Sequence, residues 1–149
     1  MNIFSENRKA HFNYEILETF QAGLVLNGQE VKSIKSGRIN LAGSYVVFQG
    51  QELFLVGSHV PAWQPANAPS NYNPERSRKL LLRKEEIDEL IGKVKERGLT
   101  LIPLRVYDQK RKIKLEFGLA RGKKKRDKRQ EIRKRDAERE IERSLKTWG

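Results

Sequence analysis

A dense block of positive charge, "RGKKKRDKR" (residues 121–129), directly follows an apolar run that is typical of a strand. Seven of its nine residues are basic, and Asp127 is its single acid. Lysine and arginine neutralise phosphates, so a run of this kind binds polyanions or forms a solvated tail. No linker separates the block from the strand, which predicts that the charge leaves the folded body in a defined direction.

Four further basic patches lie at residues 7–12, 30–38, 75–84 and 110–114. The last patch predicts Lys110, Lys112 and Lys114 on one side of a strand, about 6.6 Å apart. Such a row can follow the phosphates of a nucleic-acid strand, although charged strand faces are also common solvated surfaces. From these patches we predict RNA contacts by Asn7, Arg8, Lys9, Lys32, Lys35, Arg76, Arg78, Lys79, Lys112 and Lys114.

Patterns of catalytic and metal-binding residues are missing from this sequence. Its 149 residues contain no cysteine, which excludes disulfides, thiolate catalysis and cysteine-ligated zinc. His11 and His59 are far apart and have no acid or nucleophile close by in sequence. The acids at 85–89 are better explained as first-turn charges of a helix than as metal ligands. We therefore expect no catalytic residue, no metal and no cofactor.

The net charge of +12 and the isoelectric point of about 10.1 predict a polyanionic partner. More than half of the excess charge lies in residues 121–149. Nucleic acid is the first candidate partner, and an anionic membrane surface is the second. The chain shows no apolar segment typical of a secretory signal and no run close to the ~20 apolar residues of a membrane span. We expect a cytoplasmic protein with no membrane partner.

The apolar spacing predicts a mainly antiparallel β domain. Period-two alternation predicts a strand at 11–26 and hairpins at 45–57 and 99–120, and helical spacing predicts helices at 27–37 and 83–98. Residues 61–74 carry four of the five prolines and predict a long loop. Short strands at this spacing favour a small closed or partly closed β-barrel with a few flanking helices. We assign 1–120 to this RNA-binding barrel domain and 121–149 to a basic C-terminal tail.

The tail has a helical charge pattern but a narrow apolar stripe. Opposite charges recur four residues apart, and each such pair stabilises a helix by only about 0.2–0.5 kcal/mol. A helix of about 20 residues with so little to bury is marginal alone. We therefore predict a conditional helix, which forms when the tail lies on an anionic partner.

Four segments occur in a fixed order: "NRKAHFNYEILETFQAGLVLNGQEVKSIKSGRI", "RSRKLLLRKEEI", "GLTLIPLRVY" and "FGLARGKKKRDKR". Together they closely resemble bacterial small protein B, the family of SsrA-binding proteins, over about Asn7 to Arg135. The resemblance implies a small antiparallel β-barrel related to oligonucleotide-binding barrels. It also implies binding to the tRNA-like domain of transfer-messenger RNA (tmRNA) and, with that RNA, entry into ribosomes stalled on mRNAs that lack a stop codon.

The resemblance further implies roles for individual residues. The RNA-holding surface then also includes Gln21, Glu30 and Leu81. The tail lies against small-subunit rRNA in the decoding centre and continues into the empty mRNA channel. The decoding-centre segment comprises Arg121, Gly122, Lys123, Lys124, Arg126, Asp127, Lys128 and Arg129.

Three positions depart from the pattern of the family. Relatives often carry Glu where Gln21 stands, Trp where Gln29 stands, and His or an aromatic residue where Arg126 stands. A carboxylate contact is thus replaced by an amide at Gln21. The departures change individual contacts and leave the resemblance intact.

Charge and fold class alone leave other functions open. A generic ribosomal or rRNA-binding protein has the same charge and the same kind of barrel. A nuclease needs a carboxylate cluster or an acid/base pair, and the sequence shows neither. The ordered segments favour an RNA-binding adaptor of ribosome rescue that is not an enzyme. We expect it to act as a monomer and to meet elongation factor Tu in the delivery complex.

Overall fold

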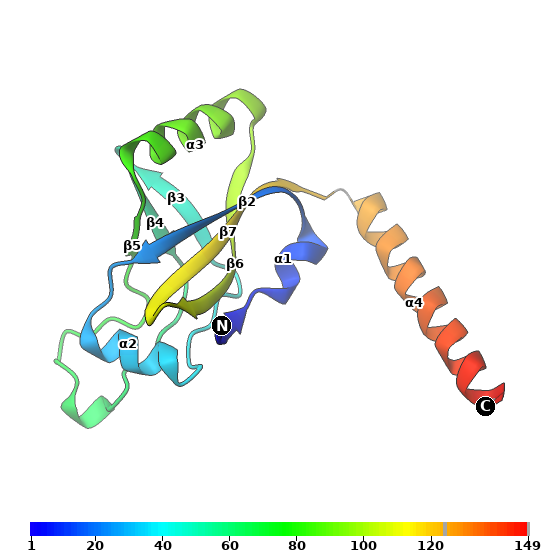
Figure 1. The fold of residues 1–149 in the computed structure, drawn as a ribbon, viewed down its shortest axis with the longest axis horizontal. Coiled ribbons are helices and arrows are strands. Elements are labelled where there is room, and N and C mark those ends of the chain that lie inside the picture. The colour runs from blue at the N-terminus through cyan, green and yellow to red at the C-terminus, as the bar shows by residue number, and fades with distance from the viewer. Residues whose placement is uncertain (124, 149) are drawn as a thin grey trace.

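Figure 1 shows the computed structural model of the chain, which describes residues 1–123 and 125–148. The side chains of residues 97, 125–127, 131 and 141–148 lie outside this description. The elements follow in the order β1 (Ile3–Glu6), α1 (Arg8–Asn13), β2 (Tyr14–Leu24), α2 (Gly28–Lys35), β3 (Tyr45–Gln49), β4 (Glu52–Val56), the 3-10 turn η1 (Pro65–Asn67), β5 (Arg78–Leu81), α3 (Lys84–Arg97), β6 (Thr100–Gln109), β7 (Lys112–Gly122) and α4 (Lys125–Trp148).

Within the described residues, seven strands form one antiparallel sheet that closes on itself. Their order is β1-β6-β3-β4-β5-β2-β7, and β6 also pairs with β7. Strand β7 therefore bonds to β2 along one edge and to β6 along the other. Closure pairs strand edges that would otherwise be exposed. The mainly β, barrel-like fold predicted from the sequence is thus confirmed.

Alternating side chains of the strands fill the inside of the ring. In β7, Leu115, Phe117 and Leu119 are buried, whereas Lys112 at the start of the strand is exposed. Helices α2 and α3 add Ile34 and Leu90 to this core, and both side chains are almost inaccessible to solvent. Burial of each such side chain stabilises the fold by about 1.5–3 kcal/mol. The apolar stripe of each helix therefore determines where the helix packs.

Most predicted elements are confirmed, among them the β3–β4 and β6–β7 hairpins and helices α2 and α3. Two local predictions are wrong. Residues 11–13 end helix α1 and do not begin a strand. Lys110 lies with Arg111 in the β6–β7 turn, at φ angles of 51° and 66°. Lys110 therefore does not share the strand face of Lys112 and Lys114. The short strands β1 and β5 were not predicted.

Helix α1 begins at a bulge in β6. The register between β6 and β7 shifts between Pro103 and Arg105. Asn7 spans this bulge, because its backbone N–H donates to the carbonyl of Leu104 (2.7 Å) and its Nδ2 donates to the carbonyl of Pro103 (2.9 Å). Only 8% of Asn7 is exposed. Asn7 thus satisfies backbone carbonyls at the bulge and positions α1, and its predicted contact with RNA stays a prediction.

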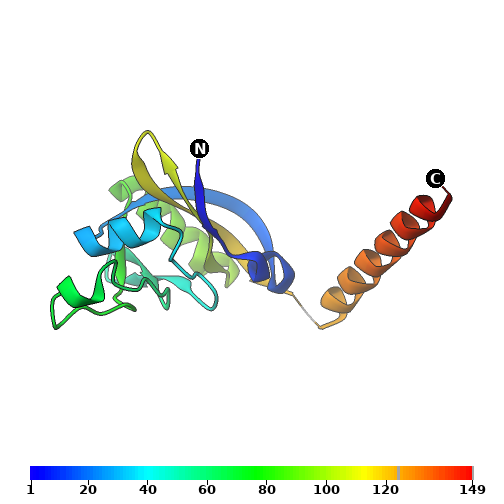
Figure 2. The same cartoon turned by 90° about the horizontal axis from the view of Figure 1, so that it is seen from below.

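The tail is helical in the structure, and α4 extends away from the barrel beside α1 (Figures 1 and 2). The described side chains of α4 are mostly exposed, including Ile132. That the helix depends on an anionic partner stays a prediction. Strand β7 ends at Gly122, two residues past the predicted domain boundary. Among the described residues, no helix is long and apolar enough to cross a membrane.

Gly118→Ala is expected to destabilise the barrel. A Cβ atom at Gly118 would lie 2.8 Å from Cγ2 of Ile16 and 3.4 Å from Cδ1 of Leu104. We expect the free energy of unfolding, measured by urea denaturation, to fall by about 1–3 kcal/mol. Gly92→Ala in α3 is the matched control, because nothing lies within 4 Å of its added Cβ. Unchanged stability of Gly118→Ala would contradict the close packing of β2 on β7.

Candidate nucleic-acid interface

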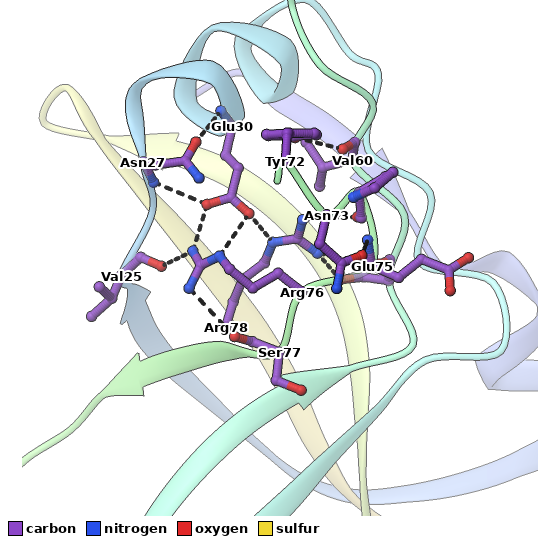
Figure 3. Close-up of polar contacts among 12 residues, drawn as sticks. Val25, Asn27, Glu30, Val60, Tyr72, Asn73, Glu75, Arg76, Ser77 and Arg78 are labelled. Atoms are coloured by element: carbon purple, nitrogen blue, oxygen red, sulfur yellow. Dashed lines mark hydrogen bonds and ion pairs between the residues drawn. The ribbon is translucent and has the colours of Figure 1, made fainter. Parts of the chain in front are cut away.

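The carboxylate of Glu30, on the first turn of α2, is the centre of a buried charge cluster (Figure 3). Its Oε1 accepts from Arg76 Nη2 at 2.5 Å, and its Oε2 accepts from Arg78 Nε at 2.5 Å. The Glu30 and Arg78 side chains have no exposed surface. The N–H of Asn27 also donates to Oε1, which completes a capping box at the start of α2. One carboxylate thus accepts hydrogen bonds from the backbone at the start of the helix and from two arginine side chains.

The two arginines link this cluster to other segments. Arg78 donates to the carbonyl of Pro74 (2.9 Å), and Arg76 donates to the carbonyl of Val25 (3.0 Å). Helix α2, strand β5 and the loop before β5 are therefore bonded to one another through Glu30. The sequence predicted that Glu30 and Arg78 contact RNA. Neither side chain reaches the surface in this structure, so contact of Glu30 and Arg78 with RNA stays a prediction.

Ion pairing lowers the pKa of Glu30. Burial is the largest single influence, and it works in the opposite direction, because it raises the pKa of a carboxyl. The hydrogen bonds from Arg76, Asn27 and Arg78 favour the charged form and outweigh burial. Glu30 is therefore ionised at neutral pH, and its charge is balanced by arginines that the sequence assigned to RNA.

A groove lies between α2, the end of β2 and the start of β7, and we call it the α2–β7 groove. It holds a cavity of about 340 Å³. Its lining combines apolar and basic side chains: Leu24, Leu26, Val31, Ile113, Lys35, Arg111, Lys112 and Lys114. An adjoining cavity of about 380 Å³ is lined by Gln21 and, again, by Leu81 and Lys114.

Leu81 lines both of these cavities and is 54% exposed, an unusual exposure for a leucine beside a packed core. Its neighbours Leu80 and Leu82 pack against or within the core. The structure therefore brings Gln21, Lys35, Leu81, Lys112 and Lys114 together at one end of the barrel. Lys32 is exposed on the same helix as Lys35.

The root of the tail lies at the other end of the barrel. Lys9 lines a cavity of about 490 Å³ together with Gly122, Lys123 and Lys128, and we call these four residues the tail-root cluster. The N–H of Lys123 donates to the carbonyl of Asn13 at 2.9 Å. Helix α1 therefore holds the point where the tail leaves β7.

Strand register separates the two ends. Gly23 pairs with Lys114, and Tyr14 pairs with Gly122. The strand from Lys114 to Gly122 is about 26 Å long at the usual rise per residue. The sequence grouped Arg8 and Lys9 with Gln21 and Lys114 on one surface. In the structure, exposed Arg8 and Lys9 belong to α1, and Lys9 is part of the tail-root cluster.

Other residues predicted to contact RNA form ion pairs within the protein or are exposed to solvent. Lys79 pairs with Glu52 at 2.8 Å, and Arg121 pairs with Glu15. Arg129 is exposed. Lys124 lies outside the described residues, as do the side chains of Arg126 and Asp127.

Sequence reasoning did not single out three residues of these surfaces. Arg111 reaches the α2–β7 groove from the turn after β6. The hydroxyl of Tyr14 donates to that of Tyr45 at 3.4 Å in the tail-root cavity, and this hydrogen bond raises the pKa of Tyr14. The two tyrosines are distant in sequence, so no local pattern predicts their contact.

Comparison with known proteins decides the family. The family model described as "SmpB protein" matches residues 4–147. The chain belongs to the SmpB family. It is 52% identical to the SsrA-binding protein of Magnetococcus marinus, over 97% of this chain and 96% of that protein. It is 47% identical to the SsrA-binding protein of Thermosynechococcus vestitus, over 98% of this chain and 96% of that protein.

A solved structure agrees with this membership. It is reported as "tmRNA-SmpB: a journey to the center of the bacterial ribosome", and its TM-score against this chain is 0.66 at 45% sequence identity. The similarity covers 81% of this chain and 85% of that chain. The family resemblance and the fold inferred from the sequence are therefore confirmed.

Glu30→Gln is expected to lower the free energy of unfolding by about 3–5 kcal/mol, because it leaves the buried Arg78 without a counter-ion. Urea denaturation at neutral pH measures this change. Glu86→Gln is the matched control. Glu86 pairs with Arg83 at 3.7 Å on the surface, so the control should change stability by less than about 1 kcal/mol. Equal effects of the two substitutions would contradict the central place of Glu30.

The same ion pairs predict a pH dependence. The folded-state pKa of Glu30 is lower than its unfolded value of about 4.3, so its contribution is fully present above that pH. The contribution is lost as the pH falls through the folded-state pKa. The stability difference between the wild type and Glu30→Gln should therefore shrink on acidification. A difference that stays constant down to the acid transition would contradict the lowered pKa.

Proposed function

We propose that this protein binds the tRNA-like domain of tmRNA, also called SsrA RNA, and delivers it to stalled ribosomes for trans-translation. The proposal is carried by the 47–52% identity, over nearly the whole chain, to proteins named SsrA-binding proteins. The solved relative is named together with tmRNA and the bacterial ribosome. The proposed action is binding alone, so the protein is not an enzyme.

The α2–β7 groove supplies the chemistry that this RNA needs. Lys35, Lys112 and Lys114 neutralise phosphates, and the exposed Leu81 gives apolar contact to a ribose or to the face of an unstacked base. Gln21 adds an amide that can donate and accept hydrogen bonds at a base edge. We assign the tRNA-like domain to this end of the barrel.

The tail-root cluster and the tail supply a second RNA surface. Lys9, Lys123 and Lys128 place three cations around one cavity, about 26 Å along β7 from Lys114. We assign this end to small-subunit rRNA in the decoding centre and α4 to the empty mRNA channel. The separation allows both RNAs to be held at the same time.

The delivery complex has further members in this proposal. Elongation factor Tu accompanies the tRNA-like domain, and the protein acts as a monomer in the cytoplasm. One chain closes its own sheet between β6 and β7, which supports a monomer.

A competition titration tests the proposed function. The full chain is titrated with the tRNA-like domain at near-physiological salt, against a scrambled RNA of equal length. Tight binding with a strong preference for the tRNA-like domain supports the proposal. Equal affinity for both RNAs would contradict it, and would leave a general rRNA-binding protein.

Lys114→Ala is expected to weaken binding to the tRNA-like domain and to reduce the slope of log affinity against log salt by about 1, since it removes one phosphate contact. Lys95→Ala is the matched control, because Lys95 is an exposed lysine of α3 outside the groove. It should leave the slope close to that of the wild type. An unchanged slope in Lys114→Ala would remove Lys114 from the RNA surface.

A chain that ends at Lys123 is expected to keep binding to the tRNA-like domain and to lose activity on stalled ribosomes. This truncation keeps all of β7 and the bond from Lys123 to Asn13, so the barrel stays intact. Binding is measured by titration and rescue by tagging of a non-stop product in a reconstituted translation system. If the truncation abolishes binding to the tRNA-like domain, the two RNA surfaces are not separate.

A further inference from the structure

Arg38 and Trp63 form a cation–π pair that neither RNA surface described above includes. The guanidinium carbon of Arg38 lies 5.2 Å from the centre of a Trp63 ring. Trp63 is half-buried, and Arg38 is exposed. A planar guanidinium on an aromatic face gains cation–π attraction, and its outer face can receive a further flat group.

The loop that carries Trp63 is held against α2. The N–H of Gln64 donates to Oε1 of Gln29 at 3.2 Å, and Nδ2 of Asn67 donates to Oε1 of Gln64 at 2.8 Å. Figures 1 and 2 both show the η1 turn beside α2. The hydroxyl of Tyr72 donates to the carbonyl of Val60 at 2.7 Å and holds the far part of the loop. The stack is therefore built on an ordered base.

The charges around the stack favour RNA. Residues 61–74 contain no charged residue, so the loop offers no carboxylate to repel a phosphate. Lys32 and Lys35 of α2 are exposed, and exposed Arg38 follows shortly after the helix ends. None of the ion pairs formed among the described residues includes Lys32, Lys35 or Arg38.

We propose that Arg38 and Trp63 form a stacking site for an unpaired RNA base, in which the base lies on the outer face of the Arg38 guanidinium. The inference rests on the proposed function, because it extends the surface that holds the tRNA-like domain. Lys35 lines the α2–β7 groove and ends α2, and Arg38 lies three residues further along the chain, after the turn at Gly37. A helix with its side chains is about 10–12 Å across, so RNA over the groove reaches the stack by crossing α2.

A base fits this site better than a phosphate or a charged peptide. A phosphate alone needs a cation but gains nothing from the indole beneath it. Unpaired bases stack on aromatic and guanidinium planes whatever their sequence. The neutral loop of amides and prolines does not repel such a base. The site therefore takes a nucleobase from a loop or bulge of the RNA.

The fluorescence of Trp63 reports whether RNA occupies the proposed site. Trp63 and Trp148 are the two tryptophans of the chain, so full-length Trp148→Phe leaves Trp63 as the single tryptophan. Its fluorescence is recorded during titration with the tRNA-like domain. We expect quenching that saturates together with binding. A spectrum unchanged at saturation would overturn the stacking site.

Binding of substituted chains gives the second readout. Trp63→Ala should weaken binding about tenfold or more, and Trp63→Phe, which keeps an aromatic face, should retain most of the affinity. Arg38→Lys keeps the charge and removes the plane, so it should lose most of what Arg38→Ala loses. Leu17→Ala, at an exposed apolar residue of β2, is the control and should bind as the wild type does.

The outcomes separate this inference from the function on which it rests. If the wild type prefers the tRNA-like domain and Trp63→Ala binds equally well, the stacking site is wrong and the proposed function stands. If Arg38→Lys binds like the wild type while Arg38→Ala is weak, Arg38 acts as a point charge and stacking is wrong. If the wild type itself shows no preference between RNAs, the proposed function fails first.

Discussion

The arrangement of this protein depends on β7, which pairs with β2 along one edge and with β6 along the other. This double pairing closes the sheet and fixes the register of three strands at once. It also sets the distance between the two basic regions, because Lys114 lies near one end of β7 and Gly122 lies at the other. The position of each surface is therefore fixed by one continuous strand and does not depend on a flexible linker.

The Glu30 cluster organises the groove end. Helix α2 joins the core through Ile34, but the loop before β5 has little regular structure to hold it. A carboxylate with two arginines supplies directional bonds there, and removing one member leaves an uncompensated buried charge. The cluster positions Lys32 and Lys35 on α2 and starts β5 at Arg78, three residues before the exposed Leu81. Charged residues thus have two separate roles in this basic protein. Some form its internal scaffold, and others remain at the surface, where we propose that they contact RNA.

Much of the fold could be predicted because local periodicity and packing agree. Alternation in β7 and the apolar stripe of α3 identify their elements directly, and Gly98 ends α3 in the left-handed conformation. Helix α1 escaped prediction because it depends on Asn7 bonding to a bulge almost 100 residues away in sequence. Strand β5 was not predicted, because its basic residues led to its assignment as an exposed RNA-binding patch. The pattern of charge could not show that Arg78 turns inward, since its partner Glu30 is brought close only by the fold.

The residues proposed to contact RNA were predicted from different kinds of signal. Lys112 and Lys114 followed from strand alternation, whereas Gln21 and Leu81 came from the family resemblance. The separation of Lys9 from Lys114 follows from the register of β2 on β7, and a linear sequence does not give that register. Assignment of Arg8 and Lys9 to the tail end is therefore a result of the structure.

Amide hydrogen exchange of the full chain, with and without the tRNA-like domain, shows directly which end of the barrel this RNA covers. We expect slower exchange in the presence of RNA in α2, around Leu81 and in the turn that leads to Lys114. Residues 8–14 and 122–128 should exchange at the same rate in both states. Protection confined to residues 8–14 and 122–128, with none around the α2–β7 groove, would contradict the assignment of the two ends.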